Sequence, residues 1–204
     1  MAQMRQHAWQ ALLYLPSKRT HEGDPVSASL TVEQLSIQDA EEAKHLYDVV
    51  VEANSGTQYD VLWRRDLHPS DKNIEDALRA GHLYGAWLDG HLVGAGIFNS
   101  DFAQGYEDVP WTHVAELDAT RCLHLFCTHP GYQGRGIATC FLERALALLK
   151  QQGVRVVRLD VFEHNLPAKR LYEKVGFTLA ANTYLTYEDQ AVSHILFSMY
   201  EIAL

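Results

Sequence analysis

The stretch that decides the fold runs Thr128-His-Pro-Gly-Tyr-Gln133-Gly134-Arg135-Gly136-Ile137-Ala138. It follows a run of apolar residues and precedes a helical pattern, so it predicts a strand that passes through a glycine-rich turn into a helix. Gly134 and Gly136 allow the backbone to approach a ligand closely. Because the amides that open a helix are unpaired and carry partial positive charge, the turn predicts a binding site for an anion, most simply a phosphate.

Glycine between a strand and a helix is often only a turn former, so the turn alone does not establish a ligand. The stretch lacks the Gly-Lys-Ser/Thr ending of a nucleoside-triphosphate loop, and no Gly-x-Gly-x-x-Gly opens a dinucleotide-binding unit. What remains is Gln133-x-x-Gly136-x-Ala138, which resembles the Gln/Arg-x-x-Gly-x-Gly/Ala motif of the GNAT superfamily of N-acetyltransferases. The resemblance implies that the amides of this loop hold the pyrophosphate of acetyl-coenzyme A (acetyl-CoA).

A second segment supports the resemblance: Asn165-Leu-Pro-Ala168-Lys-Arg-Leu171-Tyr172-Glu-Lys-Val-Gly176-Phe177. It is similar to the family's Asn-x-x-Ala-x-x-Leu-Tyr-x-x-x-Gly-Phe motif. Asn165 is a good helix N-cap and Gly176 a good helix end, which explains both ends without any ligand. Tyr172 lies about two turns after Asn165, on a helix face that also carries Ala168, Leu171 and Val175, so its phenol should point inward. An inward tyrosine is either a core residue or, as the resemblance implies, the acid that protonates the leaving thiolate.

The two motifs stand in the family's order, and the resemblance covers roughly Leu30 to Leu204. It implies a single-domain α/β (α+β) fold with a mixed central sheet of about seven strands, flanked by helices and splayed between strands 4 and 5. The predicted strand, helix and strand between Arg121 and Val161 favour a parallel pair within that sheet. Residues 29–204 would form the acetyltransferase domain, and residues 1–28, which show no clear period, an N-terminal extension.

Hydrophobic periodicity and turn residues give the individual elements. Asp89-Gly90 predicts a tight hairpin between two strands. The expected strands are Leu30–Leu35, Leu83–Leu88, His91–Asn99, Arg121–Cys127, Val154–Val161, Phe177–Tyr187 and Ser193–Glu201. One expected helix begins at Ser36–Asp39. Three more are expected over about Ser70–Ala80, Gly136–Gln152 and Asn165–Gly176.

Composition narrows the classes of function. A chain of 204 residues suits one domain. No apolar run of about 18 residues is present and no convincing cleavage site follows Ala8–Leu15, so neither a membrane span nor a signal peptide is expected, and the protein should be cytoplasmic. The formal net charge of -9 argues against a nucleic-acid partner. Cys122, Cys127 and Cys140 lack metal-ligand spacing, so no metal is expected; a reactive Cys127 is the lesser alternative to an inert core thiol.

The resemblance also assigns the contacts of acetyl-CoA, the expected co-substrate. The pantetheine arm would pair with the backbone of Phe126, Cys127 and Thr128, and one of their amides would face the thioester carbonyl oxygen. Thr128 replaces the commoner valine, which should spare a backbone interaction. The remaining binding residues are Gln133, Gly134, Arg135, Gly136, Ile137, Ala138, Thr139, Asn165 and Tyr172.

The group that accepts the amine proton is less sharply indicated. Some family members use a histidine or glutamate on the fourth strand, where this chain has His124. The two-residue period of a strand predicts that His124 shares a face with Phe126 and Thr128, and a neutral imidazole accepts a proton readily. The alternatives are a structural role for His124 and a loop carboxylate, Glu116 or Asp118, acting through water. His129 is expected to be a turn residue.

The acceptor is not encoded in either motif. The acidic loop Asp101–Asp118 either attracts a cationic acceptor or, as we favour, is a solvated loop. Trp63, Trp111 and Tyr59 suit an acceptor pocket as well as a core. We expect an N-acetyltransferase that moves the acetyl group to a primary amine of a small molecule by direct attack in a ternary complex. The alternatives are a protein N-terminal or lysine acetyltransferase acting on a peptide amine and a non-catalytic acyl-CoA sensor; a homodimer is left open.

Overall fold

The structure, a computed structural model, describes residues 29–58, 60–187 and 192–204. One open sheet runs through it in the order β1-β2-β3-β4-β5-β7-β6. The strands are β1 (Thr31–Gln34), β2 (Leu83–Leu88), β3 (His91–Asn99), β4 (Thr120–Thr128), β5 (Val156–Phe162), β6 (Thr178–Tyr187) and β7 (Val192–Ala203). The helices are α2 (Ala40–Asn54), α3 (Asp71–Arg79), α4 (Ile137–Gln151) and α5 (Leu166–Val175). The predicted mixed seven-stranded sheet with flanking helices is confirmed, whereas the predicted extension 1–28 lies outside the described residues.

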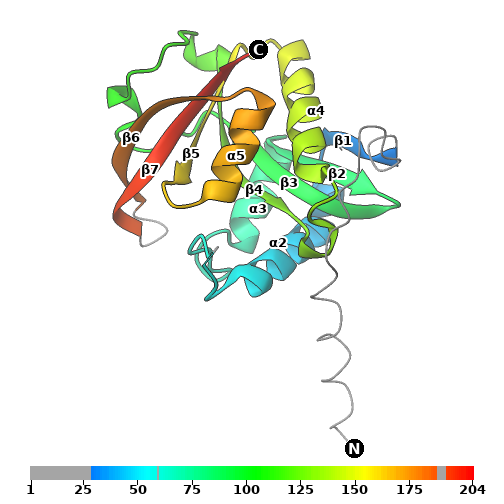
Figure 1. Cartoon of the computed structure of the whole chain (residues 1–204). Helices are drawn as coiled ribbons and strands as arrows, with labels where there is room; N and C mark the ends of the chain where they lie inside the picture. Colours follow the sequence, from blue (N-terminus) through cyan, green and yellow to red (C-terminus); the bar gives the residue numbers. More distant parts are fainter. Residues whose placement is uncertain (1–28, 59, 188–191) are drawn as a thin grey trace, which may run out of the picture.

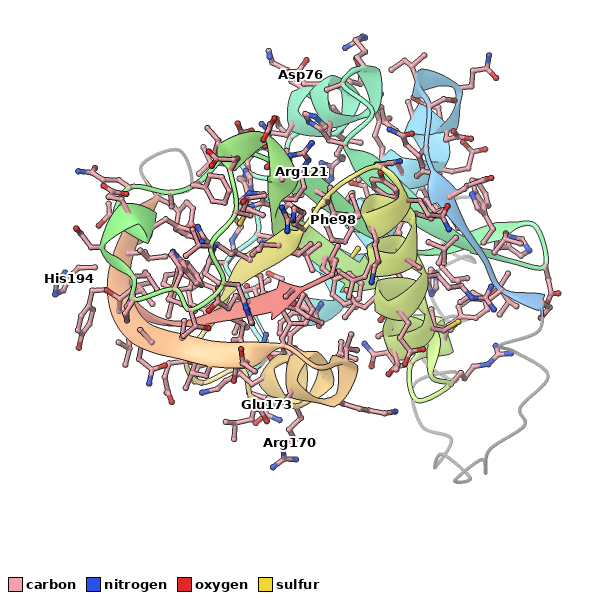
Figure 2. All side chains as sticks on the ribbon, turned by 90° about the horizontal axis from the view of Figure 1, so that it is seen from above. Asp76, Phe98, Arg121, Arg170, Glu173 and His194 are labelled. Carbon is pink, nitrogen blue, oxygen red and sulfur yellow. The ribbon has the colours of Figure 1, made fainter. Side chains whose placement is uncertain are left out.

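Both faces of the sheet are covered (Figure 1). Helices α4 and α5 pack on one face, in a core that includes Phe141 and Tyr172. Helices α2 and α3 pack on the opposite face through residues such as Leu46 and Ile74. That second face continues over β5–β7, where the segment 100–119 covers it. Seen from above, Asp76 of α3 and Arg170 of α5 project on opposite sides of the molecule (Figure 2).

Local sequence explains why these elements begin and end where they do. Ser36 and Ser70 form capping boxes that start the helical segments leading into α2 and α3. Asp89 and Gly90 both take positive φ, 52° and 79°, as a two-residue hairpin between β2 and β3 requires. The two helix starts and the hairpin were predicted from residues within one turn, and they are confirmed.

The sheet opens between β4 and β5. The two strands pair in parallel only where Thr120–Cys122 meet Val156–Arg158. β5 pairs with β7 along its whole length, and β4 pairs with β3 to its end. The part of β4 from Leu123 onward therefore has no β5 neighbour, which confirms the predicted splay and leaves backbone groups of β4 facing a gap.

Candidate functional site

A cleft of about 540 Å³ occupies the gap between β4 and β5. We call the face that carries α4 and α5 the motif side, and there the cleft is lined by Phe126, Thr128, Gln133, Asn165 and Tyr172. We call the opposite face the α2 side, and there the lining includes Asn54, Trp63, His124, Asp160 and Tyr187. The cleft thus passes through the sheet and connects the two faces.

The glycine-rich turn leads from β4 into α4 as predicted. Gly134 and Gly136 adopt left-handed φ angles of 75° and 77°. Gly136 is the N-cap of α4, and a Cβ built on it would meet no atom within 4 Å. The amides that follow it, from Ile137 to Thr139, open the helix and have no acceptor inside it. Because the turn is exposed, these amides are available to an anion.

The side chains of the turn differ in what they offer a ligand. Gln133 lines the cleft, and the Arg135 guanidinium lies 5.2 Å from the centre of the Tyr132 ring. Ile137 is buried in the core, so only its backbone can contact a ligand. Ala138 and Thr139 are half-buried in the first turn of α4. Gln133 therefore connects the turn to the lining of the cleft, and the other residues assigned to pyrophosphate follow it directly along the chain.

Helix α5 presents Tyr172 to the cleft. Asn165 caps the helix by accepting a hydrogen bond from the Ala168 amide (3.3 Å), and Gly176 ends it at a φ of 109°. The Tyr172 ring is only 7% exposed, yet its hydroxyl has no hydrogen-bond partner among the described residues. Burial, and then the negative charge of Asp160, raise the pKa of Tyr172 above its usual range. The phenol is therefore a protonated donor directed into the cleft.

Strand β4 carries a bulge that the sequence pattern does not reveal. Leu125 has a φ of 50°, and Leu125 and Phe126 together face Gly96, because Ile97 pairs with His124 and Ala95 pairs with Cys127. The Tyr47 hydroxyl donates to the Leu125 carbonyl at 2.9 Å, which ties the bulge to α2. A bulge inserts one residue and so inverts the alternation of side chains beyond it.

The prediction that His124 shares a face with Phe126 and Thr128 is wrong for this reason. Phe126 packs toward Phe141 of α4, whereas His124 lines the cleft from the α2 side. His124 Nε2 lies 2.8 Å from the backbone oxygen of Asp101. Since that oxygen only accepts, Nε2 carries a hydrogen, and it is Nδ1 that can accept a proton.

The cysteines behave as core residues. Cys122 and Cys127 are buried and Cys140 is half-buried, and none of the three forms a disulfide with another described residue. Burial raises the pKa of the Cys127 thiol to about 12, which keeps it protonated and unreactive. The described residues contain neither a helix able to cross a membrane nor a group of three or more His, Cys, Asp or Glu placed to hold a metal ion.

The residues considered for the acceptor are scattered. Trp63 lines the cleft on the α2 side, whereas Trp111 packs on Tyr106 at a ring distance of 5.6 Å. Glu116 and Asp118 line a separate, open depression and do not reach the cleft. His129 accepts a hydrogen bond from the Gly131 amide, as a turn residue does. Tyr59 lies outside the described residues.

Sequence reasoning missed Asp160. This carboxylate of β5 lines the cleft and accepts hydrogen bonds from the hydroxyls of Tyr106 and Tyr187. A signal was present in the sequence, because Arg158 and Asp160 alternate with buried apolar residues along the strand. Its tyrosine partners come from segments distant in sequence and could not have been predicted.

Solved structures share this architecture. An acetyltransferase of the GNAT family from Streptococcus agalactiae has a TM-score of 0.68 at 16% identity, covering 86% of this chain and 95% of its own. The structure of yncA from Salmonella typhimurium with its cofactor acetyl-CoA has a TM-score of 0.61 at 17% identity, covering 86% of this chain and 94% of its own. These similarities establish the fold.

Sequence relatives cover parts of the chain. Streptothricin acetyltransferase from Escherichia coli is 29% identical over 128 residues, which is 63% of each chain. Mycothiol acetyltransferase from Beutenbergia cavernae is 39% identical over 71 residues, 35% of this chain and 24% of the relative. The chain thus matches less than two thirds of the length of either relative. The model of the acetyltransferase (GNAT) family matches residues 43–177, and this chain belongs to that family.

Proposed function

We propose that the protein transfers the acetyl group of acetyl-CoA to a primary amine of a small molecule, by direct attack within a ternary complex. The observation that carries the proposal is the continuity of the cleft. It is lined by Gln133 at the start of the exposed glycine turn, by β4 residues that have no β5 neighbour, and by Tyr172, whose hydroxyl has no hydrogen-bond partner among the described residues. A purely structural tyrosine and a purely structural turn would not need to share one cavity.

The residues of the motif side fit acetyl-CoA, which supplies the acetyl group as an activated thioester. The backbone of Gly134 and Gly136 and the amides of the first turn of α4 suit a pyrophosphate. Phe126, Cys127 and Thr128 have no β5 neighbour, so their backbone is available to an extended pantetheine arm. The partial positive charge of these amides is needed, because the chain and the co-substrate are both anionic and repel each other at long range.

The chemistry then divides between the two sides of the cleft. The amine nitrogen attacks the thioester carbonyl carbon, so that a C–N bond forms as the C–S bond breaks. His124 Nδ1 takes the proton released by the nitrogen, and Tyr172 gives its proton to the departing sulfur. A backbone amide among Phe126, Cys127 and Thr128 stabilises the charge on the carbonyl oxygen. Proton exchange with water restores both side chains.

A small acceptor is favoured by the size of the cleft. A cavity of about 540 Å³ lies within the range of small-molecule sites. Proteins similar to this chain carry different compounds in their names: streptothricin, mycothiol, spermidine and an alanine of ribosomal protein S18. The peptide amine therefore stays as the competing acceptor, and a non-catalytic acyl-CoA sensor as the competing function.

The experiment is a screen of amines and of peptides for thiol release from acetyl-CoA. We expect release with small primary amines and little with peptides. Acetyl-CoA binding without release by any acceptor would identify a sensor, and release with peptides alone would identify a peptide acetyltransferase. With the best amine, His124→Gln should lower kcat and change the dependence of kcat on pH, whereas substitution of the exposed His194 of β7, His194→Gln, should change neither. An unchanged pH profile in His124→Gln would return His124 to a structural role.

A further inference from the structure

Asp160 gives the cleft a specific charge. Among the described residues that line the cleft, it is the one acidic side chain, and no lysine or arginine accompanies it there. Its neighbours Leu159 and Val161 are buried in the core of the motif side, so the carboxylate leaves β5 toward the α2 side. It therefore faces the part of the cleft that the acetyl-CoA motifs leave unassigned.

Two phenols fix this carboxylate in place. Asp160 Oδ1 accepts hydrogen bonds from the Tyr106 hydroxyl and, at 2.7 Å, from the Tyr187 hydroxyl. Burial raises the pKa of both phenols well above their usual range, so both remain donors at neutral pH. Both phenols donate to Oδ1. The other carboxylate oxygen, Oδ2, has no hydrogen-bond partner among the described residues.

The charge of Asp160 is also unpaired within the described part of the chain. The side chain is half-buried, and none of the ion pairs among these residues includes it. A carboxylate removed from water is normally paired with a cation, because desolvation of an isolated charge is costly. A carboxylate that is oriented in this way, with one free oxygen and no ion-pair partner among the described residues, is suited to a cationic ligand.

We propose that Asp160 binds an ammonium group of the acceptor that does not react, so that the preferred acceptors carry at least two aliphatic amino groups. The inference rests on the proposed acetyl transfer. The bound ammonium is assigned to a second amino group because a carboxylate that held the reacting nitrogen would stabilise its protonated form and oppose attack. The reacting nitrogen lies instead with His124 and Tyr172, which line the same cleft.

The first test needs no variant. Acetyl transfer is measured with 1,4-diaminobutane and with n-butylamine, which differ by one amino group. We expect kcat/KM for the diamine to exceed that for the monoamine by about 10- to 100-fold, as expected for a charge-assisted hydrogen bond. Equal values would overturn the inference while acetylation of both amines upheld the proposed function. Absence of thiol release with every amine and peptide would overturn both.

The second test assigns the preference to Asp160. Asp160→Asn keeps an oxygen that can accept from both phenols but removes the charge, so the ratio of the two kcat/KM values should fall to about one. Asp108→Asn removes one charge from the exposed loop and should keep the ratio. Calorimetry of 1,4-diaminobutane binding to the coenzyme A complex should show the same loss of affinity in Asp160→Asn alone. A preserved ratio or a preserved affinity in Asp160→Asn would overturn the assignment.

Discussion

The two sides of the cleft are built in different ways. On the motif side, two short segments supply most of the site: the glycine turn that begins at Gln133, and the segment from the N-cap Asn165 to Tyr172 of α5. On the α2 side, the lining residues come from α2, the segment before α3, β4, β5, β6 and β7, so neighbours in space are far apart in sequence. Backbone conformation and caps form the first side, and tertiary packing forms the second.

This difference in construction indicates which binding property substitutions on each side of the cleft can change. A site made of backbone amides and left-handed glycines tolerates little change in conformation but many changes in neighbouring side chains. A site made of side chains such as Asp160 and Trp63 can change with single substitutions. We therefore expect the motif side to set acetyl-CoA binding and the α2 side to set the choice of acceptor.

The largest effect should come from Tyr172, the one side chain of the motif side with a chemical role. Tyr172→Phe should lower kcat by about 10²- to 10⁴-fold, the usual contribution of a general acid. The KM for acetyl-CoA should hardly change, because the co-substrate is held by backbone groups. Steady-state kinetics of thiol release measure both quantities.

Tyr200→Phe is the matched control for this substitution. Tyr200 is buried, its ring lies 6.3 Å from that of Tyr172, and its hydroxyl donates to Glu173 instead of facing the cleft. It should keep most of the activity. A Tyr172→Phe variant within about twofold of wild type would assign Tyr172 to packing, since loss of a proton donor costs far more.

The next largest effect should come from the glycine turn. Gly136→Ala should weaken acetyl-CoA binding by about tenfold or more, because the new methyl group projects where backbone and phosphate approach each other. Calorimetry with acetyl-CoA measures the affinity. Alanine is preferable to a β-branched residue for this test. A φ of 77° is strained for any residue with a side chain, and the strain is greatest for β-branched residues.

Gly153→Ala separates the ligand from the strain. Gly153 lies just past the other end of α4, has a φ of 89°, and a Cβ there would also meet no atom within 4 Å. Both variants should lose a similar amount of stability, but only Gly136→Ala should lose affinity. Equal affinities in the two variants would refute the phosphate site.

The sequence predicted most of the fold because most elements are specified locally. Ser36, Ser70 and Asn165 cap helices through neighbours within three residues, and Asp89-Gly90 closes a hairpin by itself. The parallel placement of β4 and β5 followed from the strand, helix and strand pattern between them. Element ends differ from prediction by only one or two residues for the same reason.

The α2 side resisted prediction because its determinants are distant in sequence. The bulge at Leu125 is supported by Tyr47, 78 positions earlier, and nothing within β4 announces it. That bulge alone reversed the predicted face of His124. In the sequence, Asp160 is a polar residue of a mostly apolar strand, and only the fold brings the hydroxyls of Tyr106 and Tyr187 to it.

The bulge at Leu125 also links the α2 side of the cleft to the motif side. Tyr47→Phe tests how much this link contributes to stability and to kcat. The substitution leaves the buried Leu125 carbonyl without its donor, at a cost of about 1–3 kcal/mol of stability. Because the same backbone leads into Phe126 and Thr128, we expect a loss of kcat of several fold as well. Chemical denaturation and steady-state kinetics measure the two effects.

Tyr84→Phe controls for removing a hydroxyl from a buried tyrosine. Tyr84 donates to the exposed Gln152, the residue that follows α4, away from the cleft, so loss of the Tyr84 hydroxyl should cost less stability and leave kcat unchanged. Equal kinetic effects of the two substitutions would mean that the bulge carbonyl does not position the site.

The smallest effect concerns the segment that brings Trp63 to the α2 side. Asp60 accepts hydrogen bonds from the amides of Gly56 and Leu62 and pairs with Arg64, and the pair with Arg64 is the main reason that the pKa of Asp60 falls to about 2. A lowered folded-state pKa stabilises the fold above the unfolded value of 3.8, and this contribution is lost as pH falls from there through about 2.

Asp60→Asn cannot make that charge-dependent contribution. We therefore expect its thermal stability to lie below that of wild type at neutral pH, with the gap narrowing as the solution is acidified toward about pH 3. Asp76→Asn, which removes an exposed pair with Lys72 on α3, should show almost no gap at any pH. Because Asp60 orders the segment of Trp63 and not the glycine turn, the variant should raise the KM for the amine more than the KM for acetyl-CoA. A gap independent of pH, or equal changes in the two KM values, would mean that this segment supports the whole fold and not the α2 side in particular.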